Sequence, residues 1–91
     1  MRSMGEVLVA MNVMPEDPAT DLSKLQIEIK KVIPVNVKLR GMEIKPVAFG
    51  LLAIKLALQM TDGEANPDDI EMSISGLPGV GSVSVTGIDL L

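Results

Sequence analysis

The spacing of hydrophobic residues changes several times along this sequence of 91 residues, and the order of the changes limits the folds available to it. Where apolar residues alternate with polar ones, we expect a strand that buries one face. Where they recur every three to four residues, the pattern predicts an amphipathic helix. Proline and glycine separate these segments, so each run can be given approximate limits.

The first half of the chain predicts a strand, a helix and a second strand. The strand covers residues 5–14, and its apolar face is formed by Val7, Val9, Met11 and Val13. A helix follows from about residue 21 to residue 32, capped by Thr20 or Asp21 and closed before Pro34. Residues 37–44 fit a strand only if Arg40-Gly41 forms a bulge that shifts the register.

The second half predicts a strand, a helix and a last strand. Residues 51–60 carry apolar side chains on both faces, which favours a central position in the sheet. After a polar loop at 61–65, Asn66 is suited to cap a helix, Pro67 to begin it and Gly76 to end it. The Ser-Val alternation within residues 80–88 predicts the final strand.

The resulting order of strand, helix, strand, strand, helix, strand is that of the split βαβ arrangement. It predicts an α+β fold, a ferredoxin-like α/β sandwich in βαββαβ order. Right-handed crossovers place both helices on one face of a four-stranded antiparallel sheet. The length allows one core, so we expect a single domain over residues 4–91. Residues 1–3 are expected to be an upstream extension or an expression remnant, with Met4 as a second possible start.

The chain contains neither cysteine nor histidine, and this excludes most catalytic constellations. Disulfides, thiolate zinc sites, iron-sulfur clusters and thiol nucleophiles require cysteine, while histidine is the commonest general base and metal ligand. We therefore expect no cofactor and no metal site.

The net charge of −4 and the single aromatic residue point to a protein partner. Nucleic-acid binding draws its affinity from clustered positive charge and from stacking aromatics, so no direct contact with nucleic acid is expected. No apolar run approaches the roughly 20 residues of a membrane helix. The sequence thus predicts a cytoplasmic protein without a membrane partner.

Two motifs suggest ligands but have simpler explanations. Gly79-Val80-Gly81 lacks the third glycine of a dinucleotide loop and lies between a helix and a strand, so turn formation is favoured. Carboxylates cluster near the second helix, where hard cations would find oxygen ligands. The cluster lacks the spacing of a calcium-binding hand, and helix-dipole stabilisation already accounts for Asp68 and Asp69. The cluster comprises Asp62, Glu64, Asp68, Asp69 and Glu71.

The stretch Pro46-Val47-Ala48-Phe49-Gly50 contains the only aromatic residue of the chain and connects two predicted strands. Loops between regular elements often carry function, and a phenylalanine beside proline and glycine can serve as a rigid anchor for a partner. The alternative is that Phe49 closes one end of the core. The residues alone leave both interpretations open.

Several segments, in order and spacing, resemble the archaeal elongation factor 1-beta family. Met4-Gly5-Glu6-Val7 and Val13-Met14-Pro15-Glu16 are similar to the start of that family. Pro46-Val47-Ala48-Phe49-Gly50-Leu51 resembles its Pro-[Ile/Val]-[Ala/Gly]-[Phe/Tyr]-Gly signature, and Leu77-Pro78-Gly79-Val80 with the following Ser-Val repeats resembles its end. The resemblance covers essentially residues 4–91.

The resemblance implies a guanine-nucleotide exchange factor for elongation factor 1-alpha, which binds that GTPase in its nucleotide-free state and needs no catalytic side chain of its own. Eukaryotic relatives carry a lysine next to the C-terminal residue, where this chain has Leu90. We therefore expect steric intrusion by the C-terminal residues, with the signature loop and the chain end on one end of the sheet. The expected partner-binding residues are Pro46, Val47, Phe49, Gly50, Asp89, Leu90 and Leu91.

Two other functions are compatible with the predicted fold. A small-ligand-binding regulatory module would hold an effector in the loops between strands and helices and would be stabilised thermally by it. A small acidic enzyme would use carboxylates of residues 62–69 and would require a metal.

Overall fold

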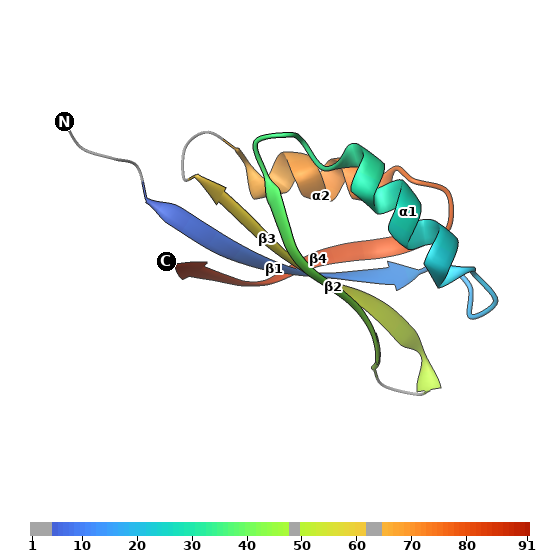
Figure 1. Ribbon diagram of the computed structural model, residues 1–91. Helices are drawn as coiled ribbons and strands as arrows, with labels where there is room; N and C mark the ends of the chain where they lie inside the picture. The colour runs from blue at the N-terminus through green and yellow to red at the C-terminus, as the bar shows by residue number, and fades with distance from the viewer. Residues whose placement is uncertain (1–4, 48–49, 62–64) are drawn as a thin grey trace.

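The computed structural model describes residues 5–47, 50–61 and 65–91. Four antiparallel strands form one sheet in the order β2-β3-β1-β4, and both helices lie on one face of it (Figure 1). This confirms the predicted ferredoxin-like α+β fold. The elements are β1 (Glu6–Pro15), α1 (Leu22–Val32), β2 (Lys38–Pro46), β3 (Leu52–Thr61), α2 (Pro67–Ser75) and β4 (Val80–Leu90). The domain start predicted at Met4 lies outside the described residues.

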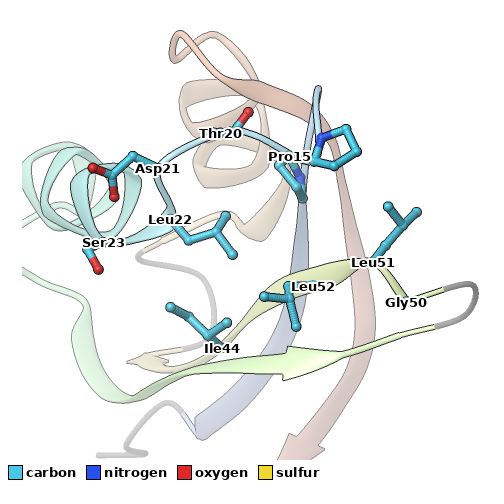
Figure 2. Close-up of a pocket in the computed structure, with 10 residues that line it drawn as sticks. Pro15, Thr20, Asp21, Leu22, Ser23, Ile44, Gly50, Leu51 and Leu52 are labelled. Atoms are coloured by element: carbon cyan, nitrogen blue, oxygen red, sulfur yellow. The ribbon is translucent and has the colours of Figure 1, made fainter.

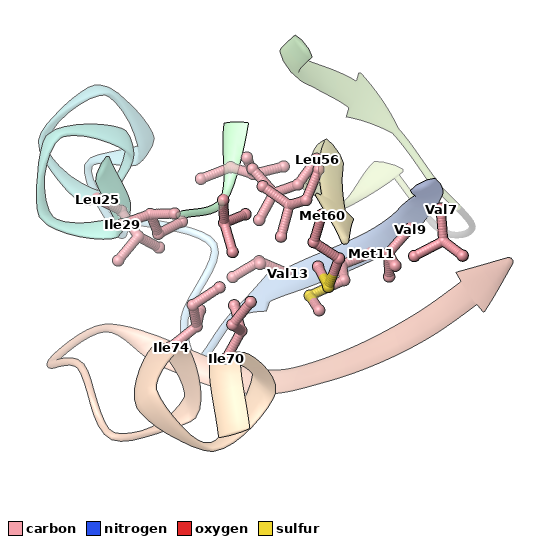
Figure 3. Packing of buried hydrophobic residues seen from close by; sticks show 13 residues of the cluster. Val7, Val9, Met11, Val13, Leu25, Ile29, Leu56, Met60, Ile70 and Ile74 are labelled. Atoms are coloured by element: carbon pink, nitrogen blue, oxygen red, sulfur yellow. The ribbon is translucent and has the colours of Figure 1, made fainter. Parts of the chain in front are cut away.

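The core lies between the helices and the two central strands (Figure 3). Strand β1 contributes the four apolar residues predicted for its buried face, and β3 contributes Ile54, Leu56, Leu58 and Met60. Leu25 and Ile29 from α1 and Ile70 and Ile74 from α2 pack against them. Each such side chain contributes roughly 1.5–3 kcal/mol when fully buried, so this layer accounts for most of the driving force for folding.

The helices begin and end where their capping residues predict. Asp21 caps α1 by accepting a hydrogen bond of 3.2 Å from the backbone N–H of Lys24. Asn66 caps α2 through Asp68 N–H at 2.9 Å, and Pro67 occupies the first helical turn. The Gly76 N–H donates to the carbonyl of Met72 at 3.2 Å and ends α2.

The sheet bends at a transverse row of small residues. Gly41, Ala57, Ala10 and Gly87 are register partners across all four strands. The β2–β3 register shifts between Leu39 and Gly41, which confirms the bulge predicted at Arg40-Gly41. The β1–β4 register shifts at the same level, after Ala10. Bulges increase the local twist of a sheet.

The turn before β4 depends on two glycines. Gly79 has φ of +92°, which disfavours other residues, and its carbonyl accepts a hydrogen bond of 2.9 Å from Glu16 N–H. A Cβ on Gly81 would lie 2.9 Å from both Glu16 Cα and the carbonyl oxygen of Pro15. Turn chemistry therefore explains the Gly79-Val80-Gly81 motif.

Candidate functional site

The two segments expected to bind a partner lie at opposite ends of the sheet. Pro46 pairs with Leu52, and Val13 pairs with Ile54, so the β2–β3 hairpin lies beside the end of β1. Leu90 pairs with Val7, so the C-terminal residues lie beside the start of β1 (Figure 1). The expectation that one end of the sheet carries both segments is wrong. Ten-residue strands at about 3.3 Å per residue separate the two ends by roughly 30 Å.

The hairpin end comprises residues 44–52. Pro46 closes β2 as a strand residue, where the sequence pattern suggested a connection. The Val47 N–H donates a hydrogen bond of 2.8 Å to the carbonyl of Leu51, and Gly50 adopts a φ of +73°. Phe49 lies outside the described residues, so its role as anchor or core plug stays a prediction.

A groove of about 380 Å³ opens between the hairpin end and the start of α1. Leu22 from α1 faces Ile44 and Leu52 across it (Figure 2). Although both strand residues lie on the helix-bearing face, Leu52 is 44% exposed and Ile44 is 39% exposed. The groove is lined by Pro15, Pro18, Thr20, Asp21, Leu22, Ser23, Ile44, Gly50, Leu51 and Leu52.

Sequence reasoning missed this groove because the pattern of apolar residues in β2 and β3 does not show how far the helices cover the strands. The strands of nine and ten residues extend beyond the helix layer, whose helices have eleven and nine residues. A strand rises about 3.3 Å per residue and a helix only about 1.5 Å. Comparison of these lengths would have shown that the ends of the strands are left uncovered.

The C-terminal segment, residues 88–91, presents exposed aliphatic side chains. Ile88 and Leu90 pair with Val9 and Val7 and thus share the helix-bearing face, yet the helices leave them exposed. Leu90 is 80% exposed and Leu91 is 66% exposed. Asp89 lies opposite Leu8 on the other face. This end therefore offers apolar surface to a partner.

A polar cluster adjoins the C-terminal segment on the open face of the sheet. The Glu6 carboxylate accepts hydrogen bonds from Gln59 Nε2 at 2.8 Å and from Thr61 Oγ1 at 2.5 Å. The hydrogen bond from Thr61, followed by that from Gln59 and the attraction of Lys38, lowers the pKa of the Glu6 carboxyl below its ordinary value. Sequence reasoning missed this cluster, because it joins residues more than 50 positions apart.

The predicted acidic cluster divides between described and undescribed residues. Asp68 and Asp69 lie in the first turn of α2, as helix-dipole stabilisation requires. Asp62 and Glu64 lie outside the described residues. Within residues 5–47, 50–61 and 65–91, no polar or charged side chain is buried. The exposed apolar residues at the two ends of the sheet are therefore the candidate contact areas considered for a partner.

The fold is shared with one domain of a different protein. The structure is similar to the C-terminal domain of the MgtC protein from Mycobacterium tuberculosis, with a TM-score of 0.54 and 16% sequence identity. The match covers 100% of this chain and 92% of that one. At this identity the likeness supports the fold alone.

The family model described as the EF-1 guanine nucleotide exchange domain matches residues 8–91. The match thus includes every helix and strand in full, except that it omits the first two residues of β1. The chain belongs to this family and is a guanine-nucleotide exchange factor of translation elongation.

Two similar proteins are both named elongation factor 1-beta. The chain is 45% identical to elongation factor 1-beta of Methanococcoides burtonii, covering 91% of this chain and 93% of that protein. It is 38% identical to elongation factor 1-beta of Methanothermobacter thermautotrophicus, covering 93% and 96%. These matches confirm the predicted family and favour exchange over the small-ligand regulatory module.

Among the described residues, no helix is long and apolar enough to cross a membrane.

Proposed function

We propose that this exchange factor acts on elongation factor 1-alpha and accelerates the release of its GDP by binding the nucleotide-free form most tightly. A ligand shifts an equilibrium only by its differential affinity for the two states, so preference for the empty form is the thermodynamic requirement. The family description and the names of the similar proteins support this partner. Such a role requires no reaction by the factor itself, and a role in translation elongation supports a cytoplasmic location.

The exposed aliphatic C-terminal segment is the single observation that supports the mechanism most strongly. By the resemblance, Leu90 stands where eukaryotic relatives carry a lysine, so this position has an aliphatic side chain in place of an ammonium group. Leu90 and Leu91 offer bulk instead, at 80% and 66% exposure. We infer that they enter the nucleotide site sterically and bind best when it is empty.

The hairpin end contributes a second contact to the same partner. It lies roughly 30 Å from the C-terminal segment along β1, so the two ends reach different regions of the GTPase. Pro46, Val47 and Gly50 frame this end, with Phe49 as the proposed aromatic anchor. Exposed Ile44 and Leu52 extend its apolar area.

Release of a fluorescent GDP analogue from elongation factor 1-alpha tests the proposal. The protein at saturating concentration, with excess unlabelled GTP, should increase the release rate strongly over the spontaneous rate. Heat-denatured protein at the same concentration is the control. Unaltered release at saturation would exclude the proposed function.

A further inference from the structure

Glu6 joins the C-terminal segment to the centre of the sheet. Its backbone carbonyl accepts a hydrogen bond of 2.9 Å from the N–H of Leu91, one residue beyond the end of β4. Its carboxylate accepts the two hydrogen bonds from Gln59 and Thr61 of β3. A single residue therefore connects β3, the start of β1 and the final residue of the sequence.

The side-chain contacts suit the task of fixing a strand end. Glu6 is the first residue of β1 and lies opposite Thr61, with Gln59 on the diagonal, where long side chains reach each other. Both carboxylate oxygens are used, and hydrogen bonds to an ionised group are stronger than neutral ones. Lys38, opposite Gln59 on β2, adds electrostatic attraction. The Glu6 backbone is thereby held in place.

On the other side of Glu6, the C-terminal segment is ordered but exposed. Its backbone continues the pairing of β4 with β1: Leu90 lies opposite Val7, and the N–H of Leu91 donates a hydrogen bond to the carbonyl of Glu6. Both leucine side chains are exposed to solvent. A segment already held in its binding geometry loses less conformational entropy when it docks. Loss of the Glu6 side-chain contacts would allow β1 to fray and release Leu91.

We propose that Glu6 is a positioning residue for nucleotide exchange, which acts through Leu90 and Leu91 and touches neither the nucleotide nor its magnesium ion. The proposal rests on the proposed function, because it assigns the C-terminal segment to the GTPase. It adds a residue from the other end of the chain to the machinery of exchange.

Four proteins test the proposal in the fluorescent-GDP assay: wild type, Glu6→Ala, a variant lacking Leu90 and Leu91, and the combination. When the concentration of the exchange factor limits the rate, Glu6→Ala should slow GDP release by about five- to tenfold. This is the effect expected when the backbone of one residue is no longer ordered before docking. In the truncated background Glu6→Ala should cause no further loss, because residues that act as one unit are not additive. Hydrogen exchange at Leu91 N–H should become faster in Glu6→Ala.

Two controls separate positioning from charge and from stability. Glu43→Ala removes an equal charge from the same sheet face, where Glu43 forms an exposed ion pair with Lys45 at 3.2 Å. Ile29→Val loosens the core where α1 packs on the sheet. Both should exchange at the wild-type rate. Thr61→Val removes one hydrogen-bond donor to Glu6 at nearly constant shape, so it should cause the same kind of loss in exchange rate as Glu6→Ala, but a smaller one. Thr61→Val is used in place of Glu6→Ala if that variant does not fold.

The outcomes are distinguishable. If the wild-type protein does not accelerate GDP release, the proposed function is wrong. The proposed role of Glu6 in exchange is then also wrong. If wild type is active but Glu6→Ala and Thr61→Val match Glu43→Ala, only the role of Glu6 is overturned. The same conclusion follows if the losses from Glu6→Ala and from truncation multiply, since Glu6 would then act independently of Leu90 and Leu91.

Discussion

Glu6 has a carboxylate whose ionised form is stabilised by the fold. Thr61 and Gln59 donate hydrogen bonds to it and lower its pKa. Because the pKa is lower in the folded state, the ionised carboxylate stabilises the fold above the unfolded value, and this contribution is lost as the pH falls through the folded value. The Glu6 side chain thus makes the stability of the fold depend on pH, and it does so at the end of the sheet that carries the C-terminal segment.

Glu6→Gln should remove this part of the pH dependence. Between neutral pH and about pH 5, wild type should be more stable than Glu6→Gln, and the difference should shrink as the pH falls below the ordinary carboxyl value of 4.5. Urea unfolding at a series of pH values measures both curves. A stability difference that stays constant as the pH falls below 4.5 would show that the Glu6 contacts do not persist in solution.

At the scale of elements, local signals in the sequence were sufficient to predict the helix starts and the bulge in β2. The first helix was expected to be capped by Thr20 or Asp21, and the structure shows Asp21; the Asn66-Pro67 pair predicted the start of the second helix. Arg40-Gly41 predicted a bulge that the register confirms. Such signals depend on neighbours in the chain. The Glu6 cluster depends on the register between β1 and β3, which is set by tertiary packing, so no local pattern reveals it.

Gly81 provides a test of the packing of elements at the start of β4. Gly81→Ala should destabilise the protein by about 1–3 kcal/mol, because its Cβ would meet the backbone of Pro15 and Glu16 at 2.9 Å. Gly87→Ala is the matched control in the same strand, since nothing lies within 4 Å of its added Cβ. Chemical denaturation of both variants decides the point, and equal stabilities would contradict the close approach.

At the scale of the whole molecule, the helix layer leaves both ends of the sheet uncovered. The hairpin end and the C-terminal segment each expose aliphatic residues of the helix-bearing face. The partner-binding residues predicted from the sequence divide between these ends. The βαββαβ order already places the β2–β3 hairpin and the end of β4 at opposite ends of the sheet, so the topology could have corrected that expectation before the structure was known.

Because the ends are roughly 30 Å apart, their contributions to partner binding should be independent. Leu52→Ser reduces the apolar area of the hairpin end without touching the core, and removal of Leu90 and Leu91 affects only the other end. The fold-losses in affinity for nucleotide-free elongation factor 1-alpha should multiply in the combined variant. A combined loss no larger than the greater single loss, in a titration by fluorescence anisotropy, would place both segments in one contact.

The central claim is that this domain promotes exchange through differential affinity. Isothermal titration calorimetry of the domain against elongation factor 1-alpha, once emptied of nucleotide and once saturated with GDP and magnesium, measures that difference directly. The account predicts clearly tighter binding to the empty GTPase, by at least tenfold, or about 1.4 kcal/mol. Equal affinity for the two forms would contradict it.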